Sequence, residues 1–332
     1  MEQALVERAG LKIELISAEG LRGKNPIAAM RGATALSKGY GQSRQIINRF
    51  QPDVLFVTGG YVCAPVTLAA RRASIPVVIY LPDVEPGLAI KSLARFATKV
   101  AVTTEDSRQF FKPGLTVVTG YPVRQELLDV VENRATSKAE ARQKLGLVDT
   151  LPVLLIFGGS RGARSINKAV SSNIEDYLTV CQVIHVSGTL DADWVQARRA
   201  EISNPVLQAR YHVSAYLHED MTTALLAADL VISRAGASVM GEFPAIGLPA
   251  VLVPYPHAGT HQALNARYLA GRHAAVAIND ADLDADLKDT VINLITNTDK
   301  LQAMSNASQQ LAKPDASLRL AQVILEVKPH GS

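Results

Sequence analysis

The chain has 332 residues, enough for about two domains that each bury a core of their own. Its 34 basic and 31 acidic residues leave a formal net charge of only +3, which argues against a nucleic-acid-binding protein. No apolar run approaches about 20 residues, so the sequence predicts no membrane-spanning helix. Cys63 and Cys181 both lie in apolar stretches, which favours buried thiols and a cytoplasmic protein over a disulfide framework.

Short apolar runs alternate with helical spacing along the first half of the chain. The predicted helices cover residues 26–50 and 63–73, and the predicted strands cover residues 11–17, 53–59, 76–81, 98–104 and 116–120. Because such near-continuous apolar strands are typical of parallel sheets covered by helices on both faces, we expect one doubly wound domain here.

The second half repeats this arrangement after a charged segment with helical spacing at residues 130–148. Strands are predicted at residues 152–159, 182–188, 228–236 and 249–256, and an amphipathic helix at residues 315–327. The predicted fold class is therefore α/β, with two doubly wound, Rossmann-like parallel-sheet domains facing a cleft in which a ligand binds.

The stretch "LIFGGSRGARSINKAV" (155–170) stops a predicted strand at two glycines and then starts a helix. In doubly wound sheets, ligands gather at the carboxyl ends of strands, and a helix start offers free N–H groups to a phosphate. Ser160 can add a hydroxyl, and Arg161 or Arg164 a positive charge. The alternative is an ordinary strand-to-helix turn with solvated arginines.

A second strand ends in glycine at Gly236, and we expect a helix from about Ser238 whose first turn faces an anion. Glu242 lies in that helix, where its carboxylate suits the hydroxyls of a ribose. The alternative for Glu242 is a favourable interaction with the helix dipole, worth about 0.3–1 kcal/mol.

The segment "PHAGTHQALNA" (256–266) then places His261, Gln262 and Asn265 near one helix face, where they can bind the hydroxyls of a sugar. A metal site at His257 and His261 is disfavoured, because no carboxylate follows nearby. We expect neither a metal nor a cofactor. His185 and His212 lie in or beside strands and are expected to be structural.

In the first half, Gly59, Gly60 and Tyr61 follow a predicted strand and precede a helix, so they either line a ligand cleft or form a tight turn. Residues 20–50 carry six basic residues and no acidic ones, interleaved with apolar side chains. Such a segment suits an anionic membrane surface, and the alternative is a solvated helix face.

Taken together, these motifs resemble the GT-B glycosyltransferases and, more closely, the MurG family of peptidoglycan synthesis. The similarity runs over nearly the whole chain and includes "PDVLFVTGGYVCAP" (52–65), "GYPVRQELL" (120–128), "FGGSRGARSIN" (157–167), "AADLVISRAGASVMGE" (227–242) and "GLPAVLVPYPHAGTHQALNA" (247–266). No single block is decisive, but their order and spacing are specific.

The resemblance implies an inverting transfer of N-acetylglucosamine from its UDP donor to the muramoyl 4-hydroxyl of undecaprenyl-linked lipid I, giving lipid II. It implies that the diphosphate, uracil, ribose and sugar of the donor contact Arg124, Ser160, Leu217, Ala237, Ser238, Val239, Glu242 and Gln262, with His261 where the family usually has another glutamine. Gly60 and Tyr61 line the acceptor side, and the basic segment rests on the cytoplasmic face of the membrane.

Two features depart from the family pattern. The family begins with a strand and a glycine-rich loop ending in histidine, and this chain starts downstream of both. Roughly 30 residues, about one βαβ unit, are expected upstream, so we expect a fragment or a late start codon and leave the catalytic base unassigned. At residues 80–83, "YLPD" replaces the family's His-Glu-Gln-Asn, so that only Asp83 can substitute for the asparagine in binding substrate.

The resemblance divides the chain into an acceptor and membrane-side domain (1–124 plus the helix 315–332) and a donor domain (125–314). Two alternatives stay open: a related transferase with another lipid acceptor, and a UDP-sugar-binding protein without turnover. A UDP-sugar epimerase of the same architecture is a weaker alternative. The epimerase would need paired acid and base carboxylates that the sequence does not show.

Overall fold

The computed structural model describes residues 3, 6–7, 10–18, 26–129, 134–159, 162–217, 220–257 and 260–329. The chain folds into two compact units. Unit 1 comprises Met1–Leu81, Pro86–Val118 and Arg319–Ser332, and unit 2 comprises Pro82–Glu85 and Thr119–Leu318. The chain returns to unit 1 within its last helix, α16 (Ala316–Glu326).

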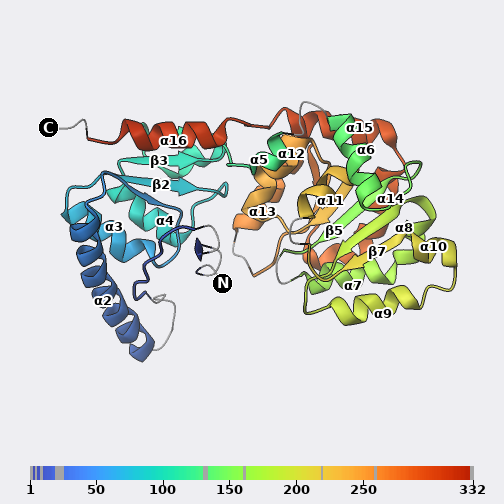
Figure 1. The fold of residues 1–332 in the computed structure, drawn as a ribbon, viewed down its shortest axis with the longest axis horizontal. Helices are drawn as coiled ribbons and strands as arrows, with labels where there is room; N and C mark the ends of the chain where they lie inside the picture. The colour runs from blue at the N-terminus through green and yellow to red at the C-terminus, as the bar shows by residue number, and fades with distance from the viewer. Residues whose placement is uncertain are drawn as a thin grey trace. The chain divides into compact units, whose positions relative to one another are not determined.

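Unit 1 is built on a four-stranded parallel sheet in the order β1-β2-β3-β4. The strands are β1 (Leu55–Val57), β2 (Val77–Leu81), β3 (Lys99–Val102) and β4 (Thr116–Val118). The helices are α2 (Pro26–Phe50), α3 (Cys63–Arg72), α4 (Leu88–Leu93), η1 (Ala94–Phe96) and η2 (Glu105–Phe110). All five residues of β2 are buried, as expected for an inner strand covered on both faces (Figure 1).

The strand predicted at residues 11–17 is wrong, because residues 11–18 have no regular secondary structure. The side chains of Leu11 and Leu15 are about two-thirds exposed, so this apolar alternation is not buried against a sheet. Instead the segment lies against α2, where the side chain of Gln42 accepts a hydrogen bond from the Ser17 N–H. Gly39 leaves room for the Ser17 carbonyl there.

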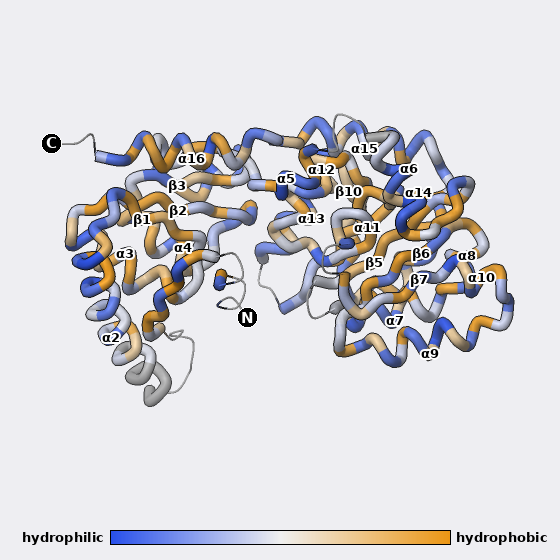
Figure 2. The backbone as a smooth tube through the Cα atoms, viewed as in Figure 1, coloured by the Kyte–Doolittle hydropathy of each residue, from blue (hydrophilic) through white to orange (hydrophobic). Residues whose placement is uncertain are grey.

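Unit 2 contains a six-stranded parallel sheet in the order β10-β9-β8-β5-β6-β7. The strands are β5 (Val153–Phe157), β6 (Gln182–Val186), β7 (Tyr211–Ser214), β8 (Leu230–Ser233), β9 (Ala250–Leu252) and β10 (Ala275–Ala277). The sequence predicted the other four strands but missed β7 and β10, which are the outermost strands. In both units, the strands themselves are rich in hydrophobic residues (Figure 2).

Helices cover both faces of the unit 2 sheet, and the strand alternation separates two cores. Val153 and Leu155 face a cluster with α6 (Arg134–Lys144), α11 (Met221–Ala227), α12 (Glu242–Ile246) and α13 (His261–Ala270). Leu154 and Ile156 face the opposite cluster with α7 (Arg164–Ser172), α8 (Ile174–Val180), α9 (Ala192–Ala200), α14 (Leu283–Ile295) and α15 (Thr298–Gln309). Unit 2 is thus a three-layer, doubly wound domain, completed by α5 (Gln125–Leu128), α10 (Pro205–Ala209), η3 (Ala237–Met240) and η4 (Asp280–Asp282).

The strand order of unit 2 reverses between β5 and β8. From β5 the chain adds β6 and β7 on one side, and it then returns to place β8, β9 and β10 on the other. In open parallel sheets, ligands bind at the carboxyl ends of the strands beside such a switch point. We call the residues that follow these strands the carboxyl edge and those that precede them the amino edge.

Candidate functional site

The turn after β5 is shaped by its three glycines, which lie at the switch point. Gly159 and Gly162 have positive φ values of 85° and 75°, a conformation that other residues adopt only with strain. The Gly162 N–H donates to the Gly159 carbonyl oxygen at 2.9 Å. A Cβ atom on Gly158 would lie 2.3 Å from the Ala163 nitrogen, so the backbone folds tightly onto itself before α7 begins.

Ser160 and Arg161, two of the predicted phosphate contacts, lie outside the described residues. Arg164 is described, and its Nε and Nη2 both lie within 2.8 Å of Asp191 Oδ1. Its side chain is nevertheless 63% exposed, because only one edge of the guanidinium faces the carboxylate. Arg164 is therefore anchored at the turn rather than freely solvated.

The second predicted helix start follows β8, but it is not one helix. Ala237, Ser238 and Val239 form the 3₁₀ turn η3, and a new helix, α12, starts at Glu242. The break lies at Gly241, where a Cβ atom would come within 2.8 Å of the Tyr121 side chain. Elements this short have little macrodipole, so any anion here is bound by individual N–H groups of the turn.

Glu242 and Arg124 form an ion pair at this edge. Arg124 Nη2 lies 3.0 Å from Glu242 Oε1, and the Glu242 side chain is only 15% exposed. Burial raises the pKa of Glu242, and the charge of Arg124 partly offsets that effect. Burial, together with the charges of Glu242 and Asp83, raises the pKa of the neighbouring Tyr121. A carboxylate and a guanidinium thus stand beside the η3 turn.

The predicted sugar-binding face at the start of α13 is only partly available. Asn265 is fully buried, and its carboxamide bonds the Val84 N–H, the Asp83 carboxylate and the Ala235 carbonyl oxygen. The expected sugar contact by Asn265 is therefore wrong, because its hydrogen-bonding groups are used inside unit 2. Gln262 Oε1 accepts the Tyr255 N–H at 2.8 Å, and His261 Nδ1 lies 3.0 Å from the Glu85 carbonyl oxygen.

Asp83 belongs to the short segment Pro82–Glu85 that the chain contributes to unit 2. Its Oδ1 accepts the Asn265 amide at 2.8 Å. Glu85 accepts a hydrogen bond from the Thr260 hydroxyl, which ties the same segment to the start of α13. Leu217 follows β7 at the carboxyl edge and packs against the core that contains Phe243.

Gly60 and Tyr61 lie in unit 1, after β1 and before α3. Gly59 and Gly60 both have positive φ values, and the Tyr61 side chain is 55% exposed. On α2, Lys38 and Arg44 are exposed, whereas Arg49 pairs with Glu14. Arg22 and Lys24 lie outside the described residues. Among the helices that the structure describes, none is both long and apolar enough to cross a membrane.

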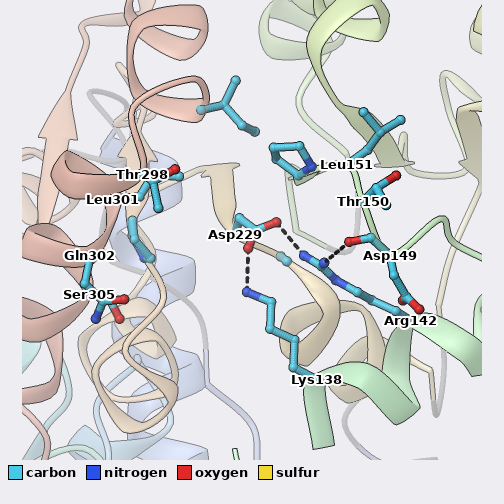
Figure 3. Close-up of a pocket in the computed structure, with 14 residues that line it drawn as sticks. Lys138, Arg142, Asp149, Thr150, Leu151, Asp229, Thr298, Leu301, Gln302 and Ser305 are labelled. Carbon is cyan, nitrogen blue, oxygen red and sulfur yellow. Dashed lines mark hydrogen bonds and ion pairs between the residues drawn. The ribbon is translucent and has the colours of Figure 1, made fainter. Parts of the chain in front are cut away.

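A hollow of about 690 Å³ opens at the amino edge of unit 2, away from all predicted site residues. Asp229 lies between Lys138 and Arg142, and Thr298, Leu301, Gln302 and Ser305 form the facing wall (Figure 3). Lys138 Nζ and Arg142 Nη2 lie 2.5 and 2.6 Å from the Asp229 carboxylate, which also accepts the Val153 N–H. The cations here neutralise a carboxylate of the chain itself, so the hollow shows no preference for an anionic ligand.

Arg234 was not among the predicted site residues, although it joins the segments that follow β5, β9 and β10. Arg234 Nη1 lies 2.5 Å from Asp280 Oδ1, and its Nη2 donates to Ser165 Oγ at 2.7 Å. Its guanidinium also lies 5.3 Å from the centre of the Tyr255 ring. The signal was present in "SRAG", where a basic residue directly follows a buried strand and stands two residues before a glycine.

The comparisons with known proteins agree with this fold. Residues 1–102 match the glycosyltransferase family 28 N-terminal domain, and residues 153–320 match the family's C-terminal domain. The chain is 41% identical to the UDP-N-acetylglucosamine–N-acetylmuramyl-(pentapeptide) pyrophosphoryl-undecaprenol N-acetylglucosamine transferase of Roseiflexus sp. (strain RS-1), over 97% of this chain and 80% of the relative.

Two solved structures extend the likeness. The crystal structure of Acinetobacter baumannii MurG matches with a TM-score of 0.76 and 25% identity, over 98% of this chain and 88% of that one. A UDP-GlcNAc 2-epimerase from Neisseria meningitidis, bound to UDP-GlcNAc, matches with a TM-score of 0.65 over 98% and 88% of the two chains. At 14% identity, the second likeness concerns the fold alone.

The two parallel-sheet α/β units, together with the matches to both domains of the family, identify the chain as a nucleotide-sugar glycosyltransferase of the GT-B fold. The chain belongs to glycosyltransferase family 28 and, within it, to the MurG family.

Proposed function

We propose that this protein transfers N-acetylglucosamine, with inversion, from UDP-N-acetylglucosamine to the muramoyl 4-hydroxyl of undecaprenyl-pyrophosphoryl-muramoyl-pentapeptide (lipid I). The product is lipid II, and the reaction belongs to peptidoglycan synthesis. Support comes from the family membership over nearly the whole chain and from the names of its relatives.

The observation that carries the proposal is the meeting of two glycine-bearing turns at one switch point. Phe157 pairs with Ser233 in the sheet, so the turn that begins at Gly158 and the turn that leads to Gly236 leave from neighbouring strand ends. The second turn presents the backbone of Ala237 and Ser238, and the Arg124–Glu242 pair stands beside it. This edge combines what a nucleoside diphosphate needs: amide donors, a cation and a carboxylate.

In the proposed donor complex, Glu242 accepts hydrogen bonds from the ribose hydroxyls, and the backbone of Leu217 contacts uracil. Ser160, Arg124 and the N–H groups of Ala237 and Ser238 contact the diphosphate, and Gln262 contacts the sugar. The Val239 N–H, which donates to the Gly236 carbonyl oxygen at 3.3 Å, joins them only by exchanging that partner. Because Gln262 Oε1 already accepts the Tyr255 N–H, the amide N–H groups of Gln262 are the ones directed to a sugar oxygen. Arg124 exchanges Glu242 for phosphate when the donor binds.

The charge that develops on the departing UDP sets the catalytic task. Amide groups and a guanidinium directed at the diphosphate stabilise that charge more strongly in the transition state than in the ground state. Preorganised donors of this kind typically contribute about 3–4 kcal/mol each when their removal is measured. The proposal requires no metal ion and assigns no general base.

For the acceptor side, we propose that Gly60 and Tyr61 contact the lipid-linked sugar. The exposed basic residues of α2 rest on the cytoplasmic face of the membrane as a peripheral contact. Asp83, the expected substitute for the family's asparagine, already accepts the Asn265 amide, so it binds substrate only by exchanging that partner. The Asp83–Asn265 hydrogen bond therefore favours a second candidate function, the related transfer to a different lipid acceptor.

The test is an assay of lipid II formation with purified protein, UDP-N-acetylglucosamine and lipid I in anionic vesicles. Transfer to lipid I is the expected result. Transfer only to another polyprenyl-linked acceptor would select the second candidate. UDP binding without transfer to any acceptor would identify a UDP-sugar-binding protein without turnover.

A further inference from the structure

Four buried side chains of unit 2 form a continuous series of hydrogen bonds that ends on an exposed arginine. Tyr211 Oη lies 2.8 Å from His185 Nδ1, and His185 Nε2 lies 3.0 Å from Asn167 Oδ1. Asn167 Nδ2 donates to Asp191 Oδ2 at 2.9 Å, and Asp191 Oδ1 accepts from Arg164. These residues come from β7, β6, α7 and the loop before α9, so the series joins four segments of unit 2.

The chemistry of the series fixes the direction of each bond. Asn167 Oδ1 can only accept, so His185 Nε2 carries the proton, and the bare Nδ1 accepts from the Tyr211 hydroxyl. Burial lowers the pKa of His185 to about 3, which keeps the ring neutral, while the charge of Asp191 acts in the opposite direction. Burial also disfavours the charge of Asp191, but hydrogen bonds from Arg164, Trp194 and Asn167 outweigh this effect and hold its pKa below the usual value.

The series supports the glycine turn after β5 through one carbonyl group. Asn167 Nδ2 also donates to the Ser187 carbonyl oxygen at 2.8 Å. A Cβ atom on Gly162 would lie 2.3 Å from that same oxygen, so the turn packs directly on it. Arg164, at the other end of the series, is the first residue of the helix that follows the turn. Asn167 therefore holds the Ser187 carbonyl under the turn, and Asp191 holds Arg164 after the turn. Asn167 and Asp191 are in turn bonded to each other.

We propose that His185, Asn167 and Asp191 are positioning residues that hold Gly162, Ala163 and Arg164, where the chain enters α7, in the geometry that binds the diphosphate of the donor. The inference rests on the proposed function, because it assigns the partner of this turn. None of the three side chains touches the donor. They act by holding the Ser187 carbonyl and Arg164. Because this part of the backbone is ordered before the ligand binds, binding costs less conformational entropy.

The test compares two isosteric variants of buried amides, Asn167→Leu and Gln182→Met. Gln182 starts β6, the strand that contains His185, but its carboxamide bonds the backbone of Val148 at the amino edge. Both variants remove a fully buried carboxamide and leave backbone groups without partners, so both should lower the melting temperature. Only Asn167→Leu should weaken UDP binding, by about tenfold or more in calorimetry.

Uridine, which lacks phosphates, serves as the second probe. The proposal expects Asn167→Leu to bind uridine as the wild type does, because the affected turn faces the diphosphate. Equal losses of UDP affinity in the two variants, or an equal loss for uridine and UDP, would overturn the inference. A wild-type protein that does not bind UDP at all would overturn the proposed function itself, which separates the two failures.

Tyr211→Phe provides a milder variant should Asn167→Leu not fold. It removes only the hydroxyl that donates to His185 Nδ1 and should raise the Kd for UDP severalfold without changing the affinity for uridine. In the wild type, the ¹⁵N shifts of the His185 ring should show a protonated Nε2 and a bare Nδ1 at pH 7 and still at pH 5. A ring protonated on both nitrogens at pH 5, or unchanged UDP affinity in a folded Tyr211→Phe protein, would contradict the proposal.

Discussion

At the amino edge of the unit 2 sheet, charged side chains pair with one another and with the backbone. At the carboxyl edge, charged side chains lie beside turns that contain glycine. The Asp229 carboxylate forms ion pairs with Lys138 and Arg142 and accepts the Val153 N–H. These contacts connect α6 to the starts of β5 and β8. At the opposite edge, Arg124 meets Glu242 beside the η3 turn, and burial raises the pKa of that carboxylate. One sheet therefore has an edge where charges pair within the chain and an edge where we propose that the donor binds.

The comparison of the two edges also shows that the described hollow does not coincide with the proposed nucleotide site. The hollow of about 690 Å³ lies at the amino edge, where the charges are already paired within the chain. The residues with the chemistry of a nucleotide site lie at the other edge, around the switch point between β5 and β8. The proposed site therefore rests on a buried carboxylate and the switch point, and not on cavity volume.

The largest effect should come from Glu242→Ala. Removing the carboxylate should raise the Kd for UDP by about 100-fold, because charge-assisted hydrogen bonds to the ribose are worth about 1.5–3 kcal/mol each. The melting temperature should change little, since burial already disfavours the charged form. Glu242→Gln, which keeps the shape and one acceptor, should give an intermediate Kd in the same calorimetric titration. Unchanged affinity would remove Glu242 from the site.

Gly162→Ala should lower the free energy of unfolding by about 2 kcal/mol or more, because it adds strain at positive φ and a clash with the Ser187 carbonyl. Gly146→Ala is the matched control. Gly146 also has a positive φ but no atom within 4 Å of the added methyl group, so only the strain of about 1–2 kcal/mol remains. Urea unfolding measures both variants, and equal losses would show that the Ser187 contact is unimportant.

Asp229→Asn should reduce stability without affecting the nucleotide. The variant leaves Lys138 and Arg142 without their shared charge, and partial exposure limits the expected loss to about 1–2 kcal/mol. UDP affinity, measured in the same preparation, should equal that of the wild type. A loss of affinity close to that of Glu242→Ala would erase the difference between the two edges.

The effect that is smallest at neutral pH concerns the pH dependence of stability. His185 has a folded-state pKa of about 3, below its ordinary value of 6.5, so the unfolded chain binds a proton between these values that the folded chain does not. Above pH 6.5, His185 is neutral in both states and the free energy of unfolding keeps its full value. As the pH falls from 6.5 towards 3, the free energy of unfolding decreases, with a slope of at most about 1.4 kcal/mol per pH unit. Urea unfolding from pH 7 to 4 should show this slope in the wild type but not in His185→Gln. Parallel curves would mean that His185 titrates normally in the folded protein.

The sequence predicted the parts of the fold that depend on local pattern. The buried runs in 76–81 and 152–159 became β2 and β5, and the spacing in 26–50 became α2. The outermost strands β7 and β10 were missed, because half-buried or very short strands lack a continuous apolar run. The segment 11–17 has the apolar pattern of a strand, but its leucines are exposed.

The site was predicted less completely, because distant contacts decide which polar groups are available. The helix predicted from Ser238 is interrupted at Gly241, where Tyr121 lies too close for any side chain at that position. Asn265 has the right spacing for a sugar contact, but the Pro82–Glu85 segment occupies its carboxamide. Spacing along a helix shows which residues share a face, whereas partners distant in sequence decide what they bind.

A crystal structure of the protein with UDP would test the central claim most directly. The account predicts ribose hydroxyls within hydrogen-bond distance of Glu242 and a diphosphate against the turns that follow β5 and β8. UDP bound in the hollow between α6 and α15, or a ribose placed away from Glu242, would contradict it.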